Sequence, residues 1–411
     1  MIVMSIILFA LTGSNDLVTA ETVLTPTEQL GQLIFFDQNL SLNENQACAA
    51  CHGPTAGWTG PEETFNAHGA VYEGSIPGAF GARKPPSSAY ATQSPIFYLD
   101  KKGQFVGGNF WDGRATGENL GNPAADQAQA SPFINPVEQA LLDPAAVVEK
   151  VCAADYADLF KQVWGNAICD STNIATAWDG IALSIASYEA SPDVNAFTSK
   201  FDYSLKGQYK LTQQERLGFA LFKGKAKCSA CHTVSGPGSL FTDYTYDNLG
   251  LPKNPENPIY NTNPDFIDLG LAGFLMARPE YSQFAPENEG KFKVPTLRNV
   301  AKGSCEAEPD NPNCITKAYG HNGYFKSLAE IVHFYNTRDV ETWPAPEVPQ
   351  NVNTAELGNL GLSADEEAAV VAFLTTLSDG YIPTRMKAAS AEEIIVLEHQ
   401  IFLPAVILDP Q

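Results

Sequence analysis

Two short stretches decide the fold: CAACH at residues 48–52 and CSACH at residues 228–232. Each follows a segment of the same kind, LTPTEQLG at 24–31 and LTQQERLG at 211–218. In both segments a Thr stands three residues before a Glu, which is the spacing of a helix-capping box. Apolar residues then recur at helical intervals, which predicts one buried stripe per helix. The repeat predicts two related domains, each mostly helical.

Four regions follow from this repeat and from the composition along the chain. We expect a signal peptide at 1–20, domains at 21–200 and 201–385, and a tail at 386–411. The signal peptide is predicted from an apolar run followed by Val-Thr-Ala, although no Lys or Arg precedes the run. Cleavage after Ala20 would place the mature protein in the periplasm. The acidic and apolar tail is predicted to be either a strap on the body or a contact for a partner.

Composition limits the partners. The chain has 411 residues, with 25 Lys and Arg against 47 Asp and Glu, so its net charge is 25 − 47 = −22. A surface this acidic disfavours nucleic acid and anionic membranes and attracts basic proteins. Beyond the signal peptide we find no apolar run long enough for a membrane span. Strand signals are few, so we expect a mostly α protein in which long Gly- and Pro-rich loops wrap a cofactor.

The two pentapeptides identify that cofactor. In Cys-x-x-Cys-His the two thiols add to the vinyl groups of a haem and the His ligates the iron. A zinc site made from the two Cys pairs would leave both histidines without a role. We therefore predict two covalently bound haem c groups, held by Cys48, Cys51, His52, Cys228, Cys231 and His232.

Four further cysteines remain, Cys152, Cys169, Cys305 and Cys314. Four cysteines allow three connectivities. In an oxidising compartment, proximity along the chain favours Cys152–Cys169 and Cys305–Cys314.

Beyond the haem motifs, several segments resemble the bacterial dihaem cytochrome c peroxidase family, and in particular its MauG-like branch. The segments are FWDGRA at 110–115, NPVE at 135–138, FKVPTLRNV at 292–300, HNG at 321–323 and FYN at 334–336. The resemblance runs from about Leu24 to Gly380 and implies roles for individual residues.

Around the first haem, the resemblance implies that Glu138 moves protons during peroxide cleavage and that Pro132 lines the distal pocket. The family's distal Gln is displaced in this chain. Ala128 occupies its position, with Gln127 and Gln129 on either side, and the sequence does not decide between these two.

Between the haems, the resemblance places Trp111 as a bridge that carries electron holes from one iron to the other. Arg114 and Arg298 are candidates for holding haem propionates, because the planar guanidinium suits a carboxylate.

The second haem differs from that of ordinary dihaem peroxidases. Their second iron ligand is a Met fourteen residues after the His of the His-x-Gly turn. Here that position, counted from His321, is Tyr335, as in MauG-like proteins. Met276 and Met386 are out of register. The loop at 75–87 also lacks the His that blocks the first iron in ordinary members, so we expect that iron to be open.

The family also binds calcium between its domains, through two backbone carbonyls and an Asn side chain. The carbonyl positions correspond to Thr316 and Ala318, but the Asn position is Lys84. An ammonium group cannot ligate calcium. The sequence leaves two alternatives: the ion is absent or replaced by the ammonium, or water and another carboxylate compensate.

The resemblance implies a periplasmic dihaem oxidoreductase that uses hydrogen peroxide to form a high-valent di-iron-haem state and oxidises a partner protein, preferably at Trp. Known outcomes are a cross-linked quinone for MauG, and kynurenine for MbnH- and CorB-like members associated with copper-binding proteins. We favour kynurenine. Two alternatives remain, a conventional dihaem cytochrome c peroxidase fed by a small cytochrome and a non-catalytic dihaem electron carrier. Oxygen with electrons could also replace peroxide.

Overall fold

The computed structural model describes residues 23–130 and 132–383. The predicted signal peptide and the tail at 386–411 lie outside these residues. Within them the protein is mostly helical, as predicted. Strands form only two small antiparallel sheets in the described part of the chain, β1 (Tyr98–Leu99) with β2 (Phe105–Val106), and β3 (Tyr246–Asp247) with β4 (Phe292–Lys293).

The helices of the first half of the chain are α1 (Pro26–Phe36), α2 (Cys48–Cys51), α3 (Glu63–Ala67), α4 (Pro123–Ala130), α5 (Pro144–Ala153), α6 (Ala157–Trp164) and α7 (Ile174–Ala190). Those of the second half are α8 (Lys200–Leu205), α9 (Gln213–Lys223), α10 (Ile259–Thr262), α11 (Leu271–Met276), α12 (Leu328–Thr337) and α13 (Ala364–Thr375).

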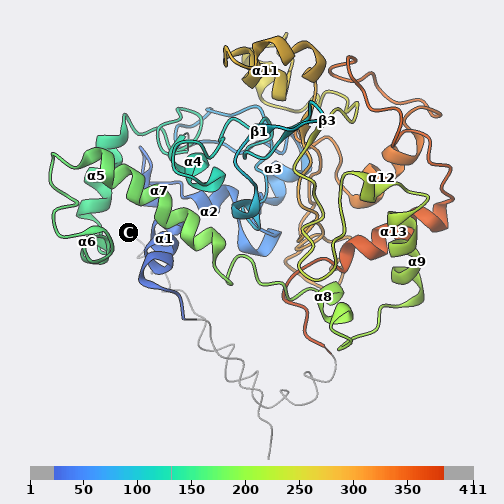
Figure 1. Ribbon diagram of the computed structural model, residues 1–411, viewed down its shortest axis with the longest axis horizontal. Coiled ribbons are helices and arrows are strands. Elements are labelled where there is room, and N and C mark those ends of the chain that lie inside the picture. Colours follow the sequence, from blue (N-terminus) through green and yellow to red (C-terminus); the bar gives the residue numbers. More distant parts are fainter. Residues whose placement is uncertain (1–22, 131, 384–411) are drawn as a thin grey trace, which may run out of the picture.

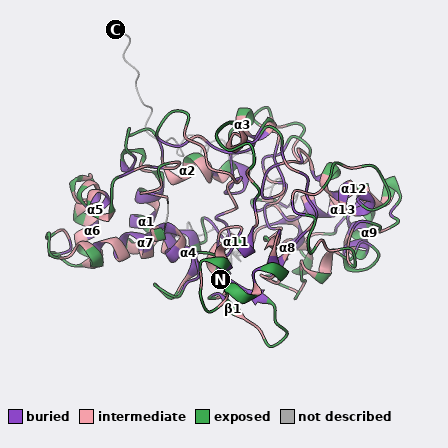
Figure 2. Ribbon diagram, turned by 90° about the horizontal axis from the view of Figure 1, so that it is seen from above, coloured by how far each residue is buried: buried purple, intermediate pink, exposed green. Residues whose placement is uncertain are grey.

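The helices gather at two ends of an elongated molecule, with loops between them (Figure 1). Buried residues concentrate at α1, α4 and α7 on one side and at α12 and α13 on the other (Figure 2). One core runs from Leu30 to Val194 and another from Phe201 to Leu377. The domain boundary near residue 200 stays a prediction.

The predicted helix starts are confirmed. Thr25 with Glu28 and Thr212 with Glu215 form capping boxes at α1 and α9, each with both reciprocal hydrogen bonds. Ser363 with Glu366 does the same at α13. Each box satisfies backbone N–H groups that the first helical turn leaves without partners.

The same helix crossing occurs in both halves and depends on a glycine. A methyl group on Gly31 of α1 would collide with the carbonyl of Ser184 in α7. A methyl group on Gly218 of α9 would collide in the same way with the carbonyl of Ala369 in α13. Since Gly31 and Gly218 occupy matching positions of the repeated segment, close backbone approach explains why both segments carry Gly there.

Loops from the first half cross to the second and bring the two candidate haem regions together. Arg83 forms ion pairs with Asp112 (2.6 Å) and with Asp268 (2.7 Å). The hydroxyl of Tyr90 donates to the carboxylate of Asp379 at 2.7 Å.

Both predicted disulfides, Cys152–Cys169 and Cys305–Cys314, are present. Across residues 23–383, apart from 131, we find no helix with the length and hydropathy that a membrane crossing requires.

The helix crossings make a stability prediction. Gly31→Ala and Gly218→Ala should each lower the free energy of unfolding by about 1–3 kcal/mol, because the added methyl group must displace a backbone carbonyl. Thermal unfolding of the purified protein measures this as a lower midpoint. Gly273→Ala is the matched control, since Gly273 is an exposed helical residue whose added methyl group would meet nothing closer than 4.0 Å. Equal midpoints for all three variants would contradict the crossing argument.

Candidate haem sites

Both motif histidines are held in the same way. Nδ1 of His52 lies 3.3 Å from the carbonyl oxygen of Trp58, and Nδ1 of His232 lies 2.8 Å from that of Phe241. With Nδ1 donating its hydrogen to a carbonyl, Nε2 is the nitrogen left to ligate a metal. Burial lowers the pKa of His52 to about 4 and also lowers the pKa of His232, so both rings are neutral, as a ligand must be.

The cysteines of the motifs are distinct from the others. Cys48 and Cys51 lie on α2, and Cys228 begins a short 3-10 helix, Cys228–Ala230. In the described part of the chain these three and Cys231 are the cysteines outside disulfides. Each half thus presents two thiols and one imidazole, a donor set that fits a haem.

A cavity of about 220 Å³ lies at the second motif. Its lining is largely apolar and includes His232, Tyr335 and Trp111. Trp111 also lines a smaller cavity of about 60 Å³ between the halves. Its indole N–H donates to the carbonyl of Lys84 at 2.8 Å, which fixes the ring between the two cavities.

Three lysines also line the large cavity: Lys84 and Lys317, which are buried, and Lys293, which is half-buried. Burial lowers the pKa of Lys84 to about 8 and that of Lys293 to about 7, and it lowers the pKa of Lys317 as well. Amino groups in such surroundings stay protonated only where an anion lies nearby. The propionate groups of haem would supply that negative charge, so the lining fits the cofactor.

Tyr335 reaches the cavity from α12, on the lining that it shares with His232. Burial raises the pKa of Tyr335 above its usual value, so the phenol is neutral unless a cation binds it. Met276 does not line this cavity and is half exposed on α11. Met386 lies outside the described residues.

Glu138 lies near the first motif. Its charge raises the pKa values of both Cys48 and Cys51, after the larger effect of burial. The side-chain amide of Asn135 donates to its carboxylate at 2.8 Å. The carbonyl of Pro132 accepts the backbone N–H of Gln139 at 2.9 Å, which fixes the same loop.

The two candidate glutamines differ in their surroundings. Gln127 lines the smaller cavity together with Trp111. The Gln129 amide donates to Asp179 at 2.5 Å and accepts from Asn119, so both of its ends are occupied.

Arg114 and Arg298, the two candidates for holding propionates, both pair with carboxylates of the chain. Arg298 is buried and donates to both carboxylate oxygens of Asp202 at 2.9 Å, although it also lines the large cavity. Arg114 is exposed, pairs with Asp112 at 2.8 Å and lies over the ring of Phe110. Their predicted roles at the propionates stay predictions.

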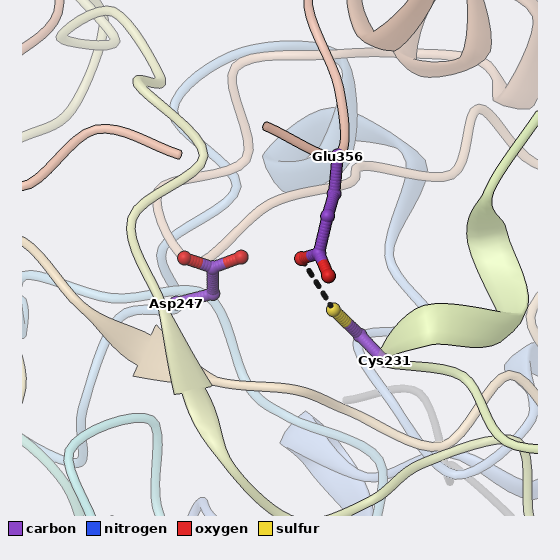
Figure 3. A group of neighbouring side chains, drawn as sticks. All are labelled: Cys231, Asp247 and Glu356. Carbon is purple, nitrogen blue, oxygen red and sulfur yellow. Dashed lines mark hydrogen bonds between the residues drawn. The ribbon is translucent and has the colours of Figure 1, made fainter. Parts of the chain in front are cut away.

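Asp247 and Glu356 lie beside Cys231 (Figure 3). The thiol of Cys231 is 3.7 Å from the carboxylate of Glu356. These three residues could hold a metal ion by geometry alone. Because Cys231 belongs to the haem motif, we read the two carboxylates as negative charge at the edge of the second haem site.

Lys84, which stands at the Asn position of the family's calcium site, cannot itself ligate that ion. Lys84 points its ammonium at the hydroxyl of Thr59, 3.0 Å away. The Lys317 ammonium donates to the carbonyls of Ala56 (2.8 Å), Asn299 (2.8 Å) and Lys302 (3.1 Å). Lys317 stands between Thr316 and Ala318, so an amino group of the chain itself joins the two halves beside the expected calcium ligands.

Sequence reasoning missed Lys293 and Lys317 as lining residues. The sequence offered one sign of this, which is that each Lys is flanked by apolar or small residues, as in Phe292-Lys293-Val294 and Thr316-Lys317-Ala318. It also gave no role to the ring of His321, which is buried, stacks on Phe292 at 3.5 Å and lines the large cavity.

The bridge that the Lys317 amine forms to the carbonyls of Ala56, Asn299 and Lys302 can be tested by Lys317→Met. The variant should unfold at a lower temperature, because three buried carbonyls lose a donor at about 1–3 kcal/mol each. Lys101→Met, which removes the same charge from an exposed site, should leave the midpoint unchanged. A calcium chelator should also leave the wild-type midpoint unchanged. A drop with chelator as large as the drop in Lys317→Met would contradict the bridge.

The chain is similar to several known proteins. The family model described as di-haem cytochrome c peroxidase matches residues 25–210. The methylamine utilization protein MauG of Paracoccus denitrificans is 34% identical over 385 residues, which cover 89% of this chain and 92% of MauG. The cytochrome-c peroxidase IdrP2 of a Pseudomonas species is 28% identical, covering 85% of this chain and 80% of IdrP2.

Two solved structures are also similar. The diheme peroxidase BthA of Burkholderia thailandensis has a TM-score of 0.72 and 27% identity, covering 87% of each chain. A MauG-like protein associated with microbial copper homeostasis has a TM-score of 0.60 and 25% identity, covering 87% of this chain and 91% of its own. The chain therefore belongs to the di-haem cytochrome c peroxidase/MauG family and is a haem-dependent oxidoreductase that holds two haems.

Proposed function

We propose that the protein is a periplasmic dihaem c-type enzyme that uses hydrogen peroxide to oxidise a side chain of a partner protein. Bound haem would take up the oxidising equivalents of peroxide. The observation that carries the proposal is Tyr335, which shares the lining of the second cavity with His232, while Met276 does not line it. An oxygen ligand lowers the potential of the iron relative to a thioether and so favours storing oxidising equivalents over accepting electrons from a cytochrome.

At the first haem, Glu138 takes a proton from the bound peroxide and returns it to the departing oxygen. This role needs a carboxylate within hydrogen-bond reach of the substrate. The influence of Glu138 on both cysteines of the first motif supports that position. Gln127 is the better candidate for the distal amide, because Gln129 is held at both ends.

Access to the first iron does not require an opening step. The loop at 75–87 carries no His, and His68 points away to an exposed pair with Glu256 at 3.1 Å. Trp111 links the two sites, since it lines both cavities and its N–H is fixed by Lys84.

The partner is a protein whose oxidised residue never enters the cavity, because electrons can travel through the chain. The net charge of −22 favours a basic docking surface. Oxidation of Trp to kynurenine on a copper-binding protein is our preferred outcome, supported by the likeness to the protein associated with copper homeostasis. Disulfides and the haem motifs suit the periplasm.

Glu138→Gln tests the proposal. The rate of reaction between the ferric, haem-loaded protein and peroxide should fall by about 10²–10⁴-fold, because the amide cannot move the proton. Stopped-flow absorption at the haem bands measures this rate. The haem content should be unchanged. Glu149→Gln, which makes the same change at an exposed position, should react like the wild type. A Glu138→Gln protein that reacts at the wild-type rate would exclude this role for Glu138, whereas a ferric wild type that does not react with peroxide would favour the electron carrier.

A further inference from the structure

Behind each motif histidine lies a triad of packed rings, and the two triads have the same construction. In the first half they are Phe35, Trp58 and Tyr188. In the second half they are Phe222, Phe241 and Phe373.

Three observations show that each residue of the first triad corresponds to one residue of the second. Phe35 and Phe222 occupy the same position of the repeated segment, five residues after Leu30 and Leu217. Trp58 and Phe241 provide the carbonyls that hold His52 and His232. Tyr188 faces Gly31 as Phe373 faces Gly218. In each pair, the Cβ atom of the aromatic residue lies 2.9 Å from where a methyl group on the glycine would stand.

The ring geometry also matches. Trp58 and Tyr188 have centroids 6.0 Å apart at 73°, and Phe241 and Phe373 are 6.2 Å apart at 63°. Phe35 and Trp58 are 5.9 Å apart, against 6.1 Å for Phe222 and Phe241. Packing therefore accepts Phe at these positions. The first half nevertheless has Trp and Tyr, the two aromatic residues that are readily oxidised.

The first triad also reaches toward the surface. The ring of Phe36, which is 43% exposed, is 6.2 Å from that of Tyr188. The side chains of Gln32 and of exposed Asp193 lie near enough to the phenol of Tyr188 to influence its pKa. Burial raises the pKa of Tyr188 to about 12, so the phenol is protonated at neutral pH and must release a proton when it is oxidised.

We propose that Trp58 and Tyr188 are a redox-active pair that supplies electrons to the first haem site from its histidine side when no partner protein is bound. The proposal rests on the proposed function, which supplies hydrogen peroxide as the oxidant. One electron passes from Tyr188 by way of Trp58 to the oxidised haem site, and one oxidising equivalent is thereby consumed. The phenol proton leaves to water on the side of Gln32 and Asp193, and a neutral phenoxyl radical remains.

The experiment uses the full-length, haem-loaded ferric protein without partner, mixed with equimolar peroxide and frozen after increasing times. Electron paramagnetic resonance should detect an organic radical, and its hyperfine pattern should narrow when the protein contains ring-deuterated tyrosine. Tyr188→Phe should lose this tyrosyl signal. Trp58→Phe should delay its appearance. Peptide mass spectrometry of the wild type after repeated additions should find oxygen added at Trp58 or cross-linking at Tyr188.

Controls separate the outcomes. Both variants should fold, since the second half packs Phe at these places, and unchanged resting haem spectra would verify this. Trp164→Phe is the matched control: Trp164 also packs on α7, where its N–H donates to Ser184 at 3.0 Å, and this variant should keep the radical. If the radical and the oxidised peptides are the same in wild type and both variants, the inference is wrong although peroxide is consumed. If the wild type does not react with peroxide, the proposed function fails first.

Discussion

The hydrogen bond from a motif histidine to a backbone carbonyl is the constraint on which the rest of the structure depends. It occupies Nδ1 of His52 and His232 and leaves Nε2 as the nitrogen that would ligate a haem iron. The carbonyls belong to Trp58 and Phe241, whose side chains are buried in the two ring triads. Those triads pack where α1 crosses α7 and where α9 crosses α13, at Gly31 and Gly218. The orientation of each motif histidine, the path of the loop that holds it and the packing of the crossing helices therefore depend on one another, and this arrangement occurs in both halves.

Local sequence signals predicted the parts of this arrangement that depend on neighbouring residues. The capping boxes of α1 and α9 and both disulfides were predicted correctly because each is encoded within a few turns or a short loop. The pairing of Arg298 with Asp202, 96 residues away, could not be predicted, since no local pattern marks the partner of a buried charge. The same holds for Lys317, whose acceptors include Ala56 of the other half.

The differences between the halves point to a division of labour. The second site has a phenol on the same cavity lining as its histidine, acidic groups beside its Cys231 and a triad made only of Phe. The first site has Glu138 nearby and oxidisable rings behind its histidine. Under the proposed function, the first site would react with peroxide and the second would hold oxidising equivalents, and Trp111 lines both cavities.

The most direct test of this division is an electron paramagnetic resonance spectrum of the ferric protein as isolated, before any reductant or peroxide is added. The account predicts one high-spin haem, open at the first site, and one low-spin haem, ligated by His232 and Tyr335 at the second. Two low-spin haems would contradict it, because the first iron would then carry a second protein ligand and could not bind peroxide directly.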